Sequence, residues 1–465
     1  MRDWENATWA SGQAETEVIR RVGEALGRRA IEMTRPNDLI LLLAGKGHNG
    51  DDVRAAQPHL PERRVELLNV DDPKAALKKF QERQSDFALV IDGLFGVGLD
   101  RPLDAGWQEL INTVNASHIP ILAADVPSGL NANTGDHFGT AIRARVTLTV
   151  GAPKEGLLET AAAEFVGRLE VAADVGLIPC PHRPEMDWTL AADFKGFPPP
   201  RPVIGHKGTF GHLGIVAGSM GFHGAAVLAS RGAQRARPGL ITLFAHESVY
   251  YPVAVQLQSA MVHPWEANSN LINLLEKFSA ILVGPGLAAT DLPEEIKTPV
   301  RRYWREFQSP MIVDASALDW LTQGAIVKDA LRVITPHPGE AARLLRSTVE
   351  KVQQHRAEAV RELSRRFGNC WVVLKGHQTL VGRSTGEIFV NSSGNPNLAQ
   401  GGSGDVLSGY LAGLLAQPLL EPEIGRAIRY AVWQHGATAD WLDKHQPNWI
   451  IEDLLEHLGM AGNAT

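Results

Sequence analysis

Residues 395–415 read NPNLAQGGSGDVLSGYLAGLL, a glycine-rich turn that runs directly into an apolar segment with small residues at helical spacing. Gly401, Gly402 and Gly404 leave backbone N–H groups accessible at the start of the predicted helix. Unpaired donors and the helix dipole favour an anion at such an end. The stretch therefore predicts a phosphate-binding loop.

Asp405 stands at the start of the same predicted helix. A carboxylate there can accept a proton from a hydroxyl that attacks a phosphoryl group. The alternative is that Asp405 only caps the helix. A single GxGD favours that structural interpretation, because a glycine-rich loop alone is a weak signal. The neighbouring motifs decide between the two.

Short apolar runs without alternation indicate buried parallel strands in both halves of the chain. They begin near Leu39, Phe87, Pro120 and Arg145 in the first half, and near His212, Gly239, Ala280, Pro310, Arg332 and Cys370 in the second. Between Leu177 and Lys207 the chain is crowded with proline, which disfavours regular structure. We therefore expect two α/β domains, residues 1–185, doubly wound and Rossmann-like, and residues 186–465.

Composition narrows the class of protein. A chain of 465 residues with 44% hydrophobic and 21% charged residues is typical of globular domains, and its net charge of −7 gives no general attraction to nucleic acid or anionic membranes. Only two cysteines occur, far apart, which argues against a disulfide framework or a cysteine zinc site. The N-terminus resembles no secretory signal, and no run of about 20 apolar residues is present. We expect a cytoplasmic protein that binds neither nucleic acid nor membrane.

Six further motifs lie in the second half; the first opens the domain, and the other five follow predicted strands, where ligands bind in open α/β sheets. They are HKGTFG (206–211), GSMGFHGAA (218–226), GPG (284–286), DASAL (314–318), TPHPGE (335–340) and KGHQT (375–379). With LAQGGSGDVLSG (398–409), this set resembles the ADP/ATP-dependent NAD(P)H-hydrate dehydratases, a branch of the ribokinase-like fold. The resemblance covers nearly all of residues 190–465.

The resemblance implies a chemistry for the second half. Asp405 would be the general base that helps the hydroxyl of the hydrated nicotinamide ring attack the terminal phosphate of ADP or ATP; phosphate is then eliminated and NAD(P)H restored. Residues matching the nucleotide-contacting positions are Lys375, Gly376, His377, Gln378, Thr379 and Gly404, and those matching the hydrate-contacting positions are Ala225, Gly286, His337 and Asp405. Mg²⁺ is expected, because phosphoryl transfer commonly needs charge neutralisation.

Each of these assignments has a structural alternative. Lys375 could be a solvated lysine at a strand end, although its place before a glycine favours a phosphate contact. His337 lies between two prolines and could only satisfy a turn. Ala225 and Gly286 could be small because backbones pack closely there.

Three motifs also follow strands in the first half: AGKGHNGDDV (44–53), DGLFGVGLDRPLD (92–104) and ADVPSGLNANTG (124–135). Singly, Asp92 and Asp125 read as loop or cap residues. Three such strand ends in one domain favour a shared pocket, with Asp92 and Asp125 as its carboxylates. Lys154 follows the fourth strand and is a candidate acid or cation partner.

Over residues 39–156 the first half resembles the NAD(P)H-hydrate epimerases, which are often fused to the dehydratase in this order in bacteria. The resemblance implies a K⁺ ion held by Asn49, Asp92 and Ser128, and proton transfer by Asp125. Oxygen ligands of this kind suit K⁺. The hydrate NAD(P)HX would be lined by His48, Asn49, Gly50, Asp51, Asp52, Gly96, Val97, Gly98, Leu99, Asp100, Arg101, Pro102, Asp125 and Lys154. A homo-oligomer is expected from the same resemblance.

The glycine loop departs from the family's usual GPGNNGGDG. Lys46, His48, Asp51 and Val53 replace a proline, an asparagine and two glycines, so side chains stand where a ligand would approach backbone. Asn49, Gly50 and Asp52 remain, so we predict a modified but functional epimerase pocket in a bifunctional repair enzyme. The alternatives are a dehydratase with a non-catalytic N-terminal module and a ribokinase-type small-molecule kinase.

Overall fold

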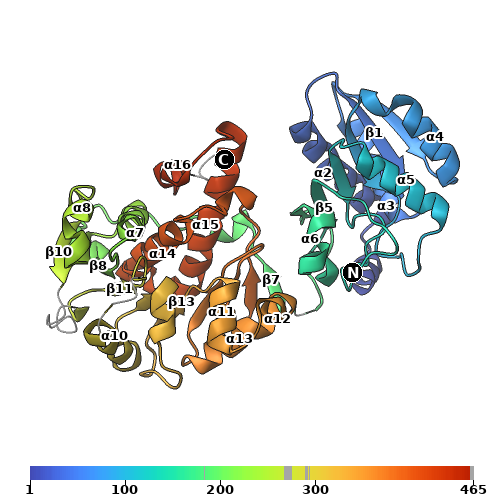
Figure 1. Cartoon of the computed structure of the whole chain (residues 1–465). Coiled ribbons are helices and arrows are strands. Elements are labelled where there is room, and N and C mark those ends of the chain that lie inside the picture. Colours follow the sequence, from blue (N-terminus) through green and yellow to red (C-terminus); the bar gives the residue numbers. More distant parts are fainter. Residues whose placement is uncertain (183, 266–274, 289–291, 293, 461–465) are drawn as a thin grey trace. The chain divides into compact units, whose positions relative to one another are not determined.

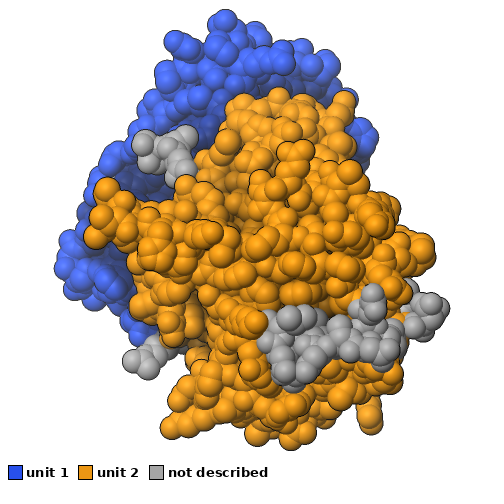
Figure 2. Space-filling view, turned by 90° about the vertical axis from the view of Figure 1, so that its left-hand side faces the viewer, with its two compact units in different colours: residues 1–184 blue, residues 185–465 orange. Residues whose placement is uncertain are grey.

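The computed structural model describes residues 1–182, 184–265, 275–288, 292 and 294–460. The chain divides into two compact units, residues 1–184 and 185–465, each with its own sheet (Figures 1 and 2). The two α/β domains expected from the sequence are therefore present. Within the described ranges, none of the helices is long and apolar enough to cross a membrane.

The sheet of unit 1 has six parallel strands in the order β2-β1-β3-β4-β5-β6. The strands are β1 (Leu39–Ala44), β2 (Arg64–Asn69), β3 (Phe87–Gly93), β4 (Ile121–Ala124), β5 (Val146–Val150) and β6 (Arg168–Ala172). Helices α2 (Glu15–Met33) and α3 (His48–Ala56) pack on one face, and α4 (Pro73–Arg83) and α5 (Ala105–Ala116) on the other. Successive residues of β1 enter opposite cores, which is why its sequence is apolar throughout.

Two short helices complete unit 1, α1 (Arg2–Ala10) and α6 (Ala163–Val166). Because all six strands are parallel, their carboxyl ends share one edge of the sheet. The three motifs of the first half lie after β1, β3 and β4, at that edge.

The sheet of unit 2 has ten strands in the order β10-β9-β8-β11-β12-β13-β14-β15-β16-β7, in which only the β14–β15 and β15–β16 pairings are antiparallel. The strands are β7 (Met186–Trp188), β8 (His212–Val216), β9 (Leu240–His246), β10 (Met261–Trp265), β11 (Ala280–Val283), β12 (Met311–Val313), β13 (Arg332–Ile334), β14 (Trp371–Leu374), β15 (Leu380–Gly382) and β16 (Ile388–Val390).

Helices cover both faces of this sheet (Figure 1). The described helices are α7 (His223–Ala236), α8 (Tyr250–Ala254), α10 (Glu294–Glu306), α11 (Pro338–Leu345), α12 (Val349–Gln354), α13 (Arg356–Arg366), α14 (Ser403–Leu415), α15 (Ile424–His445) and α16 (Ile451–His457). The helices α7, α14 and α15 share one hydrophobic core. Apart from HKGTFG, which precedes β8, the motifs of the second half again lie after strands, at the carboxyl edge of the sheet.

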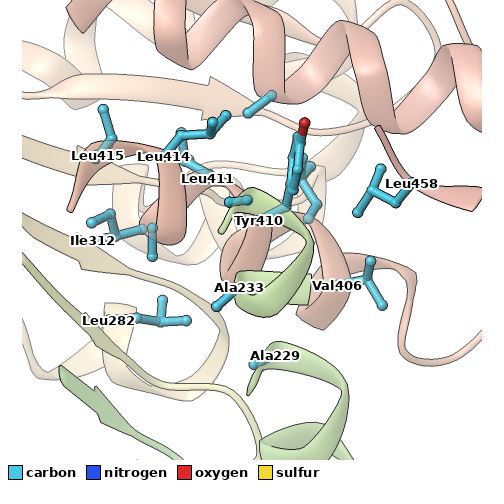
Figure 3. Close-up of a cluster of buried hydrophobic side chains, with 14 of the residues drawn as sticks. Ala229, Ala233, Leu282, Ile312, Val406, Tyr410, Leu411, Leu414, Leu415 and Leu458 are labelled. Atoms are coloured by element: carbon cyan, nitrogen blue, oxygen red, sulfur yellow. The ribbon is translucent and has the colours of Figure 1, made fainter. Parts of the chain in front are cut away.

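The small residues of α14 serve close packing against α7. A Cβ atom at Gly409 would lie 1.9 Å from the carbonyl oxygen of Ala229, so the two backbones touch. Figure 3 shows Ala229 and Ala233 of α7 beside Val406 and Tyr410 of α14. This contact fixes the helix that follows the predicted phosphate-binding loop against the helix that follows the GSMGFHGAA motif.

Candidate functional site

A nearly buried lysine lies at the strand-end edge of unit 2. Lys375 follows β14, and its Nζ lies 2.8 Å from Oδ1 of Asp314, which follows β12. The same oxygen accepts a 2.7 Å hydrogen bond from Thr335 Oγ1. Glu340 Oε2 lies 4.0 Å from the ammonium group. Burial alone would lower the pKa of Lys375, but these carboxylates raise it, so the group stays charged.

The ammonium group of Lys375 faces the start of α14. A Cβ atom at Gly404 would lie 3.4 Å from Lys375 Nζ. Gly402 is the N-cap of α14, with a φ of 94°, and provides no side chain to occupy the first N–H groups of the helix. The cation and the helix N-terminus therefore border the same space, and both attract an anion.

Asp405 lies in the first turn of α14 beside this space. Among the described residues, its carboxylate has no hydrogen-bond or salt-bridge partner, so it does not cap the helix. Burial raises its pKa to about 7, the charge of Asp314 adds to the rise, and Lys375 opposes it. A carboxyl group that titrates near neutral pH suits a general base.

Of the remaining positions implied for the hydrate, Gly286 and Ala225 are in contact, and His337 lies at the start of α11. A Cβ atom at Gly286 would lie 2.9 Å from the Cβ of Ala225, and Gly286 O accepts a 2.7 Å hydrogen bond from Ser219 Oγ. His337 is half exposed and caps α11, because its Nδ1 accepts from the backbone N–H of Gly339 at 3.0 Å. The turn role of His337 is therefore present, and its ligand role stays a prediction.

The loop between β14 and β15 carries the other nucleotide-binding candidates, Gly376, His377, Gln378 and Thr379. Burial lowers the pKa of His377, and the charge of Arg356 adds to this effect. Another histidine supports the phosphate-binding loop from the core. His435 of α15 is buried with its Nε2 3.1 Å from Ser403 O, and burial lowers its pKa to about 4. The neutral ring therefore donates to that carbonyl.

Several residues of this site were not singled out from the sequence. Asp314, Thr335 and Glu340 lie inside the DASAL and TPHPGE motifs, and their position after strands was the available signal. Arg356 and His435 lie on helices outside every motif, and nothing in the sequence alone marks them.

Unit 1 brings Asp92, Ser128 and Asn49 into one hydrogen-bonded cluster. Ser128 donates to Asp92 through its N–H at 2.9 Å and its Oγ at 2.7 Å. Asn49 Nδ2 donates to Phe95 O at 2.6 Å, and Phe95 N donates to Ser128 Oγ at 2.8 Å. Oδ1 of Asn49 is buried without a hydrogen-bond partner in the part of the chain that the structure describes. Burial raises the pKa of Asp92 to about 6 against its hydrogen bonds from Ser128 and Leu94.

Asp125 and Lys154 form an ion pair at the ends of β4 and β5. The Nζ of Lys154 donates to Asp125 Oδ1, to Thr149 Oγ1 at 2.9 Å and to Val150 O at 3.0 Å. Asp125 Oδ1 also accepts from Val150 N at 2.9 Å. Asp125 has a φ of 59°, a left-handed conformation that its contacts hold in place.

Asp52 of α3 is a further carboxyl group that interacts with this ion pair. Burial raises its pKa to about 8, and the charges of Asp125, Asp51 and Glu5 add to the rise. At neutral pH Asp52 is therefore protonated. The site thus contains one ion-paired carboxylate and one neutral carboxyl group, which is the arrangement of an acid and base pair.

The residues that depart from the usual glycine loop are directed away from this cluster. Lys46 and His48 are 77% and 71% exposed; Lys46 forms an ion pair with Asp71, and His48 Nε2 lies 3.1 Å from Glu15 Oε1. Asp51 pairs with Arg54 of the same helix at 2.8 Å. Val53 is fully buried in the core.

The loop after β3 contains the predicted lining residues 96–102. A Cβ atom at Gly96 would lie 3.2 Å from the Cβ of Asn49, so the structure brings these two together. Leu99 packs against the core formed by α4 and α5. Gly98, Asp100, Arg101 and Pro102 are exposed.

Comparison with known families matches both units. The NAD(P)H-hydrate dehydratase family matches residues 213–459, and a family described as YjeF-related protein N-terminus matches residues 66–156. A bifunctional NAD(P)H-hydrate repair enzyme of Gloeobacter violaceus is 36% identical over 95% of this chain and 92% of its own length. This chain belongs to the bifunctional NAD(P)H-hydrate repair enzymes. The repair enzyme of Coxiella burnetii is 30% identical over 100% of this chain and 98% of its own.

Solved structures resemble unit 2 of this repair enzyme. The ADP/ATP-dependent NAD(P)H-hydrate dehydratase of Bacillus subtilis, co-crystallised with ATP/Mg²⁺, is 31% identical with a TM-score of 0.51, covering 58% of this chain and 97% of its own. A ribokinase-like superfamily protein of Enterococcus faecalis is 26% identical with a TM-score of 0.53, over 61% and 97%. The ribokinase-like fold expected from the sequence is confirmed.

Proposed function

We propose that unit 2 dehydrates the S epimer of NAD(P)HX with ADP or ATP, and that unit 1 interconverts the R and S epimers. The observation that carries this proposal is the placement of Asp405. Its carboxylate has no partner among the described residues, titrates near pH 7 and lies beside Lys375 at the phosphate-binding loop.

In the proposed dehydration, Asp405 accepts the proton of the ring hydroxyl as its oxygen bonds to the terminal phosphorus. The bond between that phosphorus and the nucleotide breaks, and the shortened nucleotide leaves. Phosphate then departs with the former hydroxyl oxygen, while the adjacent ring carbon loses a proton and the double bond of NAD(P)H is restored. Lys375 and the N–H groups of α14 stabilise the negative charge of the transferred group.

Mg²⁺ fits the oxygen donors at this site. Such an ion is usually held by one or two carboxylates together with the phosphates of the substrate. Asp314 and Glu340 are the buried carboxylates nearest to Lys375 and would hold it there. The ion would supply charge neutralisation when it is bound.

In the proposed epimerisation, Asp125 and Asp52 supply opposite protonation states. Asp125, paired with Lys154, accepts a proton from the hydrate, and Asp52 donates one. Lys154 holds Asp125 in its orientation through its bonds to Thr149 and Val150. One carboxylate and one neutral carboxyl group can act on the hydrate in a single pocket.

K⁺ fits the cluster around Asn49. Oδ1 of Asn49, which is buried without a hydrogen-bond partner among the described residues, belongs to the hydrogen-bonded cluster that also contains the oxygens of Asp92 and Ser128, so an oxygen-binding cation would satisfy it. We propose that these three residues hold K⁺, which would keep the loops after β1, β3 and β4 in register with one another.

A mixture of R and S NADHX, supplied to the purified chain with Mg²⁺ and K⁺ and either ADP or ATP, tests the whole proposal. Complete conversion to NADH, faster than spontaneous epimerisation, is expected and identifies the donor. Conversion that stops when one epimer is consumed would refute the epimerase assignment. A stable phosphorylated product in place of free phosphate would instead favour the kinase.

A further inference from the structure

Arg356 is a half-buried cation at the nucleotide-binding edge of unit 2. It is the first residue of α13, which packs against β14 and β15. Its guanidinium donates to the backbone carbonyls of His377 and, at 3.4 Å, of Leu374. Leu374 ends β14 and His377 lies in the loop that follows, so Arg356 borders the KGHQT segment.

The charge of Arg356 is not balanced. Among the described residues, no carboxylate lies within salt-bridge distance of its guanidinium. Its Nε is buried without a hydrogen-bond partner there. Burial lowers its pKa to about 10, with no opposing charge. A desolvated cation of this kind is costly unless an anion pairs with it.

A second unsatisfied donor lies in the KGHQT segment itself. Nε2 of Gln378 is also buried without a partner in the described chain. Both atoms are donors, so the group that would satisfy them is an acceptor, and the charge of Arg356 makes that acceptor an anion. Gly376 lies beside the guanidinium, since a Cβ atom there would lie 3.5 Å from Nη2 of Arg356, and its lack of a side chain adds no bulk at that point.

We propose that Arg356 and Gln378 form a second anion subsite, which binds the phosphate that stays on the donor nucleotide after transfer. This inference rests on the proposed nucleotide-dependent dehydration. Lys375 and the start of α14 bind the transferred phosphate, and Arg356 binds the retained one. A planar guanidinium with several donors suits a phosphate better than an ammonium group does.

Arg356→Gln in the full chain tests the subsite, with isothermal titration of ADP, AMP and adenosine in Mg²⁺ and K⁺. We expect the affinity for ADP and AMP to fall about 10- to 100-fold, because a charge-assisted contact to phosphate is lost. Adenosine affinity should be unchanged. In turnover, the KM of Arg356→Gln for ADP should rise with little change in kcat. The KM of Arg356→Lys should lie between those of the natural chain and Arg356→Gln.

Arg361→Gln is the matched control, because Arg361 lies on the same helix and donates only to Gly386 O in the described structure. It should bind all three ligands as the natural chain does. Equal loss of adenosine and ADP affinity in Arg356→Gln would overturn the subsite and leave Arg356 as a support for the loop. Unchanged ADP affinity would also overturn it, with the proposed function intact. A natural chain that neither binds nor consumes ADP or ATP would refute the proposed function itself.

Discussion

Lys375 and Asp314 form a nearly buried ion pair that joins the ends of β14 and β12, with 2.8 Å between Nζ and Oδ1. Both charges act on Asp405, in opposite directions. Asp314 raises the pKa of Asp405, and Lys375 lowers it. Burial is the largest cause of the raised pKa of Asp405, and the ion pair adjusts the pH at which the proposed base becomes active.

Substitution of the two partners should move the pH profile of dehydration in opposite directions. Asp314→Asn removes a like charge and should shift the apparent pKa in kcat/KM to lower pH by about one unit; because Asp314 would also hold Mg²⁺, the variant should need more Mg²⁺ and is compared at saturating Mg²⁺. Lys375→Met removes the opposing charge and should shift it to higher pH, with a large rise in KM for the nucleotide. Profiles of phosphate release from pH 5 to 9 measure both. Shifts in the same direction would contradict the assignment of the base.

Asp405→Asn should abolish phosphate release and keep nucleotide binding. It should also stabilise unit 2, because the pKa of Asp405 in the folded chain, about 7, exceeds its ordinary value of 3.8. Stability from this group is complete at low pH and is lost as the pH rises between these two values. The gain should be on the order of 1–3 kcal/mol at pH 8 and vanish near pH 4.

Thermal unfolding at several pH values checks this expectation, and the transition that ADP shifts belongs to unit 2. A gain in melting temperature that is the same at pH 4 and pH 8 would mean that the pKa of Asp405 is not raised in the folded chain. Retained turnover would refute its role as base.

Unit 1 should respond to K⁺ through Asn49. K⁺ should raise its melting temperature relative to an equal concentration of choline chloride, by the amount that ligand binding to the folded state alone predicts. Asn49→Leu should remove this response, whereas Asn112→Leu, on the exposed side of α5, should keep it. The response should weaken below pH 6, where Asp92 becomes protonated. A K⁺ response that survives Asn49→Leu would place the ion elsewhere.

Epimerisation should require both Asp125 and Asp52. Asp125→Asn should reduce the rate to near its spontaneous value and leave dehydration of the S epimer unchanged. Asp52→Asn should also be inactive, and the natural enzyme should lose activity above about pH 8 as Asp52 ionises. These rates are measured by starting from one purified epimer and using chromatography to monitor the appearance of the other. Asp86→Asn, an exposed carboxylate at the surface of unit 1, is the control. Equal rates for the natural chain and Asp125→Asn, both at the spontaneous value, would support the non-catalytic module, and an accelerated rate in Asp125→Asn would refute the role of Asp125.

The strand-end motifs predicted the sheets because buried parallel strands are apolar on both faces, as in β1 and β3. The sequence did not reveal β2, β6 and β10, whose residues are partly exposed, or the three-residue strands β7, β15 and β16. These strands are too short or too polar to be distinguished from turns in the sequence. Pairing with neighbours distant in the chain stabilises them instead.

The site was predictable where its residues follow strands or a glycine-rich loop. Lys375, Asp92 and Asp125 were identified at strand ends, which converge in an open sheet, and Asp405 was identified from the glycine-rich loop that begins its helix. Arg356 acts across 21 residues of sequence through its bond to His377 O, and His435 reaches Ser403 across 32. Such contacts depend on helix packing, which local sequence does not encode.

The contact between Val53 and Gly93 limits how this chain can change. A Cβ atom at Gly93 would lie 2.4 Å from Cγ2 of Val53, and Val53 itself is fully buried. Restoring the glycine that related loops carry at position 53 would open a void and cost about 3 kcal/mol. Enlarging residue 93 first would clash with the valine. A Cβ atom at Gly93 would also lie 2.6 Å from the backbone oxygen of Asn49, so removing the valine side chain would not by itself make room for a larger residue 93. The glycine is therefore held by the backbone as well as by the valine, and a graft of the usual loop would leave the void at position 53 unfilled.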